Sequence, residues 1–178
     1  LWTLLLAFVF RLTGVHDVVP FVLNILAAGA LVVLVGQVLD AEGFTPVEAA
    51  STIAAAVLFA PVVPMVWIGM EHSTNTVFVV AAASAAVDLA RQTARARPHT
   101  LLLFTLLACA TRFESVFVAT GCAALLLLAG RTWLAVATVG AAALPVVANG
   151  AWNLAHGWFF LPASLLMKST LPAGDTSW

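Results

Sequence analysis

Long apolar runs separated by short polar stretches constrain the fold of this chain more than any other feature. A bilayer core about 30 Å thick is crossed by a helix of roughly 17 to 25 mostly apolar residues. Six segments reach or approach that length: 21–39, 49–68, 74–90, 99–111, 113–130 and 132–149. They predict a single all-α domain, a polytopic transmembrane bundle of about six spans.

The charge content supports this interpretation and excludes other classes. Charged residues make up 8% of the 178-residue chain and hydrophobic residues 63%, whereas a soluble domain carries about 25% charged residues to cover its core. The expected solvent of the bundle is therefore the lipid bilayer. The formal net charge is −1, so no basic surface favours a nucleic-acid partner.

The segment 99–130 decides how many times the chain crosses. As one helix it would be about 48 Å long, and it would bury Arg112 and Glu114 near the middle of the membrane. Each charge costs at least about 2.5 to 3.5 kcal/mol there. Two short helices that turn at 111–114 avoid this cost, so we expect a hairpin.

The arginines then set the orientation, because short cytoplasmic loops collect Arg and Lys. Arg91, Arg95 and Arg97 place their loop in the cytoplasm, together with Arg131 and the polar turn 40–46. We expect the opposite ends of the spans to face outward. On that side, 1–12 is interpreted as a juxtamembrane or re-entrant helix. Residues 150–178 are interpreted as an outer tail with a re-entrant or interfacial segment.

Ionisable residues gather on this predicted outer side. Charged groups at membrane depth usually face a cavity, pair with one another and mark function. A polar cleft is therefore expected there. Its candidate residues are Glu71, His72, Arg112, Glu114, His156 and Lys168.

Each candidate also has a structural explanation. Arg112 and Glu114 fit a turn-capping pair, and Lys168 fits a side chain that extends to the lipid headgroups. The two histidines lack the spacing of metal ligands, so no metal site is predicted. On the inner side, Asp88 is expected to balance the neighbouring arginines.

Three short motifs in a fixed order add a resemblance. They are Gly69-Met70-Glu71-His72, Thr111-Arg112-Phe113-Glu114, and a late segment that runs from Gly157 through Leu161-Pro162 to Lys168-Ser169. The series resembles bacterial GT-C-fold glycosyltransferases, polytopic enzymes that use polyprenyl-phosphate-linked sugars. Phe113 stands where many members have Pro, and Ala163 stands where Asn is frequent.

The resemblance implies a function and a location. It implies transfer of a sugar from a lipid-phosphate donor to a glycan, lipid or protein acceptor during cell-envelope synthesis. The membrane would be the bacterial cytoplasmic membrane, with the site facing outward. The family's catalytic Asp lies on the first outer loop. It is expected upstream of Leu1, so we interpret the chain as a fragment.

The resemblance also implies roles for the candidate residues. Arg112 and Lys168 would support the departing polyprenyl phosphate. Glu71 and Glu114 would orient Arg112 or bind sugar hydroxyls, and His72 and His156 would donate hydrogen bonds to the phosphate or the acceptor. No cofactor is implied with certainty, and a requirement for a divalent metal stays open.

Two other classes remain as alternatives. A transporter or permease subunit would carry charges along a path near the membrane midplane, often in repeated halves. No internal repeat is present, and the charges lie at span ends. A noncatalytic membrane scaffold has no need to gather Arg, Glu, His and Lys on one side.

Overall fold

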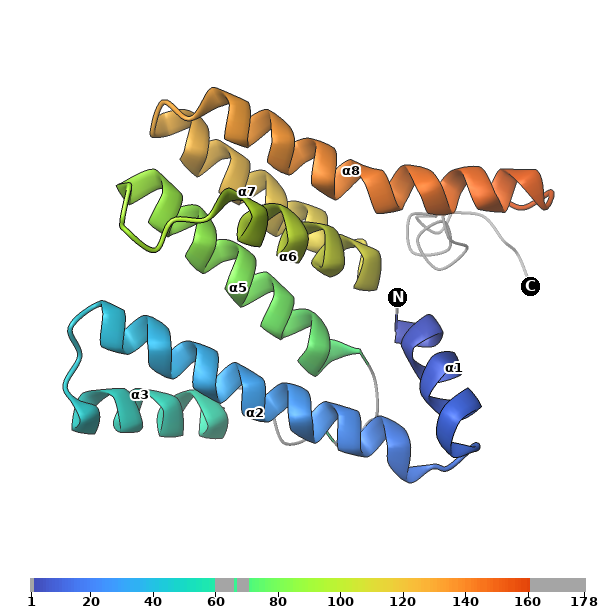
Figure 1. Cartoon of the computed structure of the whole chain (residues 1–178), viewed down its shortest axis with the longest axis horizontal. Coiled ribbons are helices and arrows are strands. Elements are labelled where there is room, and N and C mark those ends of the chain that lie inside the picture. Colours follow the sequence, from blue (N-terminus) through green and yellow to red (C-terminus); the bar gives the residue numbers. More distant parts are fainter. Residues whose placement is uncertain (1, 60–65, 67–70, 161–178) are drawn as a thin grey trace, which may run out of the picture.

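The computed structural model describes residues 2–59, 66 and 71–160 of the chain. These residues form seven α-helices, which confirms the all-α prediction (Figure 1). The helices are α1 (Trp2–Thr13), α2 (Val18–Ala41), α3 (Pro46–Phe59), α5 (His72–Arg91), α6 (Pro98–Thr111), α7 (Ser115–Leu128) and α8 (Thr132–Ala155).

Helix α5 lies at the centre of the packing. It contacts α2, α6 and α7, while α8 packs against α6 and α7. The buried face of α5 is built from small residues, among them Ala82, Ala85 and Ala86. Small side chains allow helix backbones to approach closely, which is how helices associate in lipid. Leu101, Leu126 and Leu134 of the neighbouring helices complete this core.

Helices α2 and α3 form an antiparallel pair, and α2 packs against α5 (Figure 1). The turn between them contains Gly43 at φ +83°, a conformation that glycine adopts without steric cost. Helix α3 then starts with a capping box. The Thr45 hydroxyl and backbone N–H both donate to Oε2 of Glu48, at 2.7 and 2.8 Å, so a backbone donor before the first turn is satisfied.

The predicted break at 111–114 is confirmed. Helix α6 ends at Thr111, α7 begins at Ser115, and the chain reverses direction between them (Figure 1). Helix α8 differs from the prediction, because it continues past residue 149 to Ala155. The helix accommodates Pro145 and Gly150 and ends only before Gly157, which adopts φ +76°. The first residues of the predicted outer tail are therefore helical.

Three of these helices, α2, α5 and α8, are long and apolar enough to cross a membrane. Helices α3, α6 and α7 have 14 residues each and are therefore about 21 Å long. The second predicted span, 49–68, is helical as far as Phe59, and most of its remainder lies outside the described residues.

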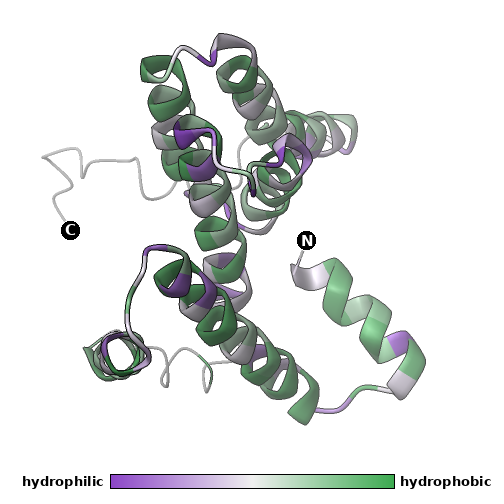
Figure 2. Cartoon of the chain, turned by 60° about the vertical axis from the view of Figure 1, so that its left-hand side comes forward, coloured by the Kyte–Doolittle hydropathy of each residue, from purple (hydrophilic) through white to green (hydrophobic). Residues whose placement is uncertain are grey.

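Apolar residues make up most of each described helix (Figure 2), and many large apolar side chains are exposed. Phe117, Leu128 and Leu58 each leave 80% or more of their surface exposed. Many exposed large apolar side chains on one molecule indicate contact with lipid or with another protein. The described part of the chain thus has the character of a multi-pass membrane protein.

Candidate functional site

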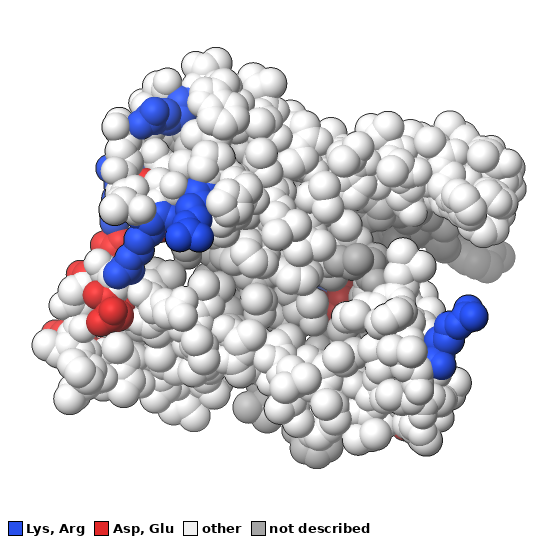
Figure 3. Space-filling model, in the orientation of Figure 1, with Lys and Arg blue, Asp and Glu red and all other residues white. Residues whose placement is uncertain are grey.

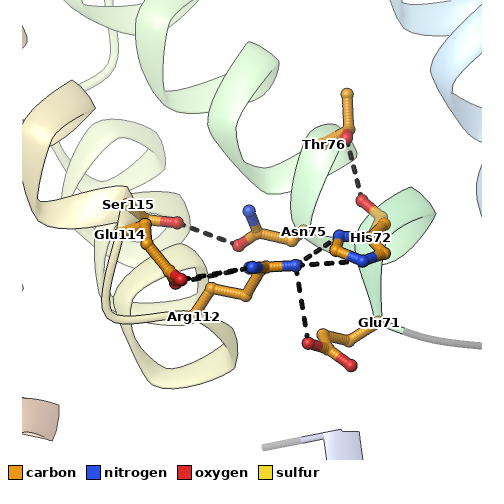
Figure 4. Close-up of polar contacts among 7 residues, drawn as sticks. All are labelled: Glu71, His72, Asn75, Thr76, Arg112, Glu114 and Ser115. Atoms are coloured by element: carbon orange, nitrogen blue, oxygen red, sulfur yellow. Dashed lines mark hydrogen bonds and ion pairs between the residues drawn. The ribbon is translucent and has the colours of Figure 1, made fainter. Parts of the chain in front are cut away.

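The two predicted outer turns meet in the folded chain. The start of α5 carries Glu71 and His72, and the turn between α6 and α7 carries Arg112 and Glu114. The side chains of these four residues, the outer cluster, point toward one another (Figure 4). Four of the six predicted site residues are therefore brought together.

Arg112 is the centre of the outer cluster. Its Nε lies 3.4 Å from Oε2 of Glu114, and its Nη2 lies 3.3 Å from Oε1 of the same carboxylate. Its Nη1 forms an ion pair with Glu71 Oε1 at 3.6 Å. Nη1 also contacts both ring nitrogens of His72, with Nε2 at 3.2 Å and Nδ1 closer. Two carboxylates and an imidazole thus hold the guanidinium between the helices.

The helix ends explain why these side chains converge. Glu71 and Glu114 occupy the N-cap positions of α5 and α7, where a negative charge is stabilised by the positive end of the helix dipole. Arg112 is the C-cap of α6 and has an extended backbone. It therefore leaves the helix and extends toward the two carboxylates.

A neutral hydrogen bond reinforces the same junction. The Ser115 hydroxyl donates to Oδ1 of Asn75 at 3.0 Å and joins the first turn of α7 to the first turn of α5 (Figure 4). Ser115 is buried, with 4% of its surface exposed. The sequence analysis missed this pair, because its only signal was two small polar residues near the predicted turns.

Part of the outer cluster is accessible to a ligand. Among the described residues, Nη2 of Arg112 contacts one oxygen, Oε1 of Glu114, although this nitrogen carries two N–H donors. The side chains of Arg112 and Glu71 are each 23% exposed, and that of Glu114 is 50% exposed. A ligand can therefore approach the carboxylates and the edge of the guanidinium.

A small cavity adjoins the outer cluster. Its volume is about 140 Å³, and it is lined by Trp2, Leu5, Thr74, Phe78 and Thr111. Helix α1 supplies two of these residues and so covers this part of the junction. Four of its lining residues lie on α1 or α5, and the fifth, Thr111, directly precedes Arg112 in the chain.

The remaining two predicted site residues do not join the outer cluster. His156 lies at the end of α8, where its Nδ1 is 2.8 Å from the Trp152 carbonyl oxygen. Its ring lies between the rings of Trp152 and Trp158, with centroids 4.4 and 5.9 Å away. Lys168 lies outside the described residues.

Two buried polar residues toward the N-terminal ends of their helices have side-chain groups without a hydrogen-bond partner among the described residues. Asn24 of α2 is fully buried, and its amide nitrogen and oxygen have no hydrogen-bond partner among the described residues. The buried hydroxyl of Ser73 in α5 also has no hydrogen-bond partner among the described residues. Neither residue was predicted as a site residue, because single polar residues inside apolar helices carry no spacing signal.

The opposite end of the bundle has its own polar contacts. Arg91 forms an ion pair with Glu42, which links the ends of α5 and α2. Asp88 lines the same cavity as Arg91, Arg95 and Arg97, but in the described part of the chain it forms no ion pair with them. Its carboxylate instead accepts a hydrogen bond from the Thr93 hydroxyl at 3.0 Å, because the turn after α5 brings Thr93 back toward the helix.

Metal binding finds no support in the described part of the chain, where no three His, Cys, Asp or Glu side chains form a group that could hold an ion. Cys109 and Cys122 are both buried there as free thiols. No protein-family model matches the sequence, and searches of curated proteins and of solved structures found no similar protein.

Proposed function

We propose that this chain belongs to an integral membrane glycosyltransferase with six spans, in which the outer cluster binds a polyprenyl-phosphate sugar. The observation that carries the proposal is the position of Arg112 among Glu71, His72 and Glu114. These residues come from two motifs that are far apart in the sequence, and the resemblance to GT-C-fold enzymes assigns both motifs to one site.

The proposed reaction forms a bond between an acceptor hydroxyl oxygen and the anomeric carbon of the sugar. The bond from that carbon to the phosphate oxygen breaks, and its electron pair leaves with the polyprenyl phosphate. The hydroxyl proton passes to a general base. The resemblance expects this base to be an Asp upstream of Leu1, and no described residue is assigned that role.

Arg112 would stabilise the leaving group. Negative charge develops on the phosphate as the glycosidic bond breaks, and a positioned guanidinium stabilises such charge strongly where water is scarce. Glu71 and Glu114 fix the side chain of Arg112 before the substrate arrives. Their carboxylate oxygens can also accept hydrogen bonds from sugar hydroxyls.

The other implied residues have smaller roles. His72 would donate a hydrogen bond to the phosphate from one ring nitrogen, in place of the contact that this nitrogen makes with Arg112. Lys168 would add a second positive charge. His156 would bind the acceptor beside Trp152 and Trp158. The proposed location is the bacterial cytoplasmic membrane, with the outer cluster on the extracytoplasmic side.

The test is sugar transfer in membranes that express the complete gene. A radiolabelled polyprenyl-phosphate sugar is supplied, and label in envelope products is measured. Arg112→Ala and Arg112→Lys should abolish transfer while the protein still inserts. Lys keeps the charge but not the fork of donors, so its failure would show that geometry matters.

Arg131→Ala is the matched control, because Arg131 lies in the turn between α7 and α8 at the other end of α7. It should keep transfer near the unsubstituted level. Transfer that is unchanged in Arg112→Ala would overturn the proposal. Uptake of a solute without any sugar transfer would favour the transporter alternative.

A further inference from the structure

A cavity of about 630 Å³ lies at the end of the bundle opposite the outer cluster. It is lined by residues of α2 and α5, of the turn that follows α5 and of the first turns of α6. Volumes of this size are typical of sites for small molecules. The residues assigned to sugar transfer above do not line it.

The inner part of the cavity is apolar. Leu34 and Val38 of α2, Val77 and Ala81 of α5, and Phe104 of α6 line it. The small residues of α5 leave room here between α2 and α6. An acyl chain can occupy such a space, whereas a fully polar ligand would lose hydration there without compensation.

The rim of the cavity is charged, and its charges are only partly balanced. Its acidic groups are engaged, since Glu42 pairs with Arg91 and Asp88 accepts from Thr93. Arg95 and Arg97 also line the cavity, and neither has an ion pair or hydrogen bond from its side chain in the described part of the chain. Two exposed guanidinium groups therefore remain free at the rim.

The N-terminus of α6 adds further positive charge to the rim of the cavity. Arg97 is its N-cap, without a side-chain cap, and Thr100 in the first turn lines the cavity. The helix N-terminus favours a negative charge. Acidic and basic side chains gather at this end of the molecule, around the turns that follow α2 and α5 (Figure 3).

We propose that this cavity binds an anionic phospholipid. The headgroup phosphate pairs with Arg95 and Arg97, and one acyl chain enters the apolar interior between α2, α5 and α6. The cavity lies at the ends of two helices that can cross a membrane, α2 and α5, which is the level of the headgroups. Basic pockets between transmembrane helices bind anionic headgroups by this combination of charge and apolar contact.

The test measures lipid binding to the purified full chain in detergent. The binding of phosphatidylglycerol, phosphatidylcholine and glycerol phosphate is compared by native mass spectrometry, with thermal stabilisation as a second measurement. The unsubstituted protein should bind phosphatidylglycerol in preference to phosphatidylcholine. The double variant Arg95→Ala/Arg97→Ala should bind it at least about tenfold more weakly, because two charge-assisted hydrogen-bond donors are lost.

Two further variants make the result specific. Arg131→Ala removes a positive charge outside the cavity and should leave binding unchanged. Ser84→Leu keeps both arginines but fills the cavity from α5, because Ser84 lines it. This variant should reduce phosphatidylglycerol binding while the protein unfolds at a similar temperature.

Three outcomes would overturn the proposal. The first is equal binding of phosphatidylglycerol and phosphatidylcholine, and the second is unchanged binding in the double variant. The third is equally strong stabilisation by glycerol phosphate, which would show that the arginines bind a free phosphate without an acyl chain. Because the site shares no residue with the outer cluster, each outcome is independent of sugar transfer.

Discussion

The carboxylate of Glu71 and the guanidinium of Arg112 form an ion pair, with 3.6 Å between Oε1 and Nη1. The pair ties the start of α5 to the turn between α6 and α7. Both side chains are 23% exposed, so water screens the pair only partly. The contact joins residues that are distant in sequence and therefore depends on the fold of the whole bundle.

Glu71 and Arg112 should be energetically coupled. Each single change, Glu71→Gln or Arg112→Ala, should lower the free energy of unfolding. The double variant should lose about 0.5 to 1 kcal/mol less than the sum, because either single change already removes the pair. A double-mutant cycle from unfolding in mild detergent measures this coupling. Exactly additive effects would show that the pair contributes no stability.

The Asn75–Ser115 hydrogen bond should contribute to the same junction. Asn75→Ala leaves the buried Ser115 hydroxyl without its acceptor, so we expect a loss of about 1 kcal/mol. Thr120→Ala is the control, since its exposed hydroxyl donates only to the Val116 carbonyl oxygen of its own helix. Equal stability of the two variants by thermal unfolding would contradict the role of the bond.

The small residues of α5 should not tolerate enlargement. Ala86 is fully buried in the core among α5, α6, α7 and α8, so Ala86→Leu should cost about 1 to 3 kcal/mol through overpacking. Ala54→Leu on the exposed face of α3 is the matched control and should change stability little. The prediction fails if both variants unfold at the same temperature.

The capping box at the start of α3 should respond to acid. Hydrogen bonds from the Thr45 backbone and side chain lower the pKa of Glu48 below its ordinary value of 4.5. A carboxyl group with a lowered pKa stabilises the fold above its unfolded pKa. That contribution is lost as the pH falls through the folded value.

Hydrogen exchange at the Thr45 amide tests this behaviour, because that N–H donates to Glu48. The amide should be protected at neutral pH and should lose protection once the pH falls below the lowered pKa of Glu48. Glu48→Gln should weaken protection at neutral pH and remove this acid-dependent step. If the Thr45 amide of Glu48→Gln still loses protection at the same pH, the loss arises from another group and the prediction is wrong.

The apolar runs predicted most of the helices, since a long apolar segment in lipid can satisfy its backbone only as a helix. The cost of burying Arg112 and Glu114 predicted the break between α6 and α7. Counting the predicted membrane crossings placed Glu71 and Arg112 on the same side of the membrane. These features depend on sequence order and hydropathy, which the sequence contains directly.

The contacts between helices could not be predicted in the same way. Helices such as α2 and α7 are apolar on all sides, so the hydrophobic pattern does not fix their rotation. The Asn75–Ser115 bond and the burial of Asn24 depend on that rotation. The hydrogen bond from Thr93 to Asp88 depends on the local turn after α5, where Gln92 adopts φ +57°.

The proposed topology puts the outer cluster and the arginine-rich turn after α5 on opposite sides of a membrane. Single cysteines can test it directly, with Phe113→Cys in the outer turn and Ala94→Cys in the turn after α5. The unsubstituted chain is the blank, because Cys109 and Cys122 are buried. A membrane-impermeant maleimide is then applied to intact cells and to opened cells.

We predict that Phe113→Cys is labelled in intact cells and that Ala94→Cys is labelled only after the cells are opened. Labelling of both positions from the same side would contradict the account. It would place the ends of α6 on one face of the membrane and remove the topology on which the outer site depends.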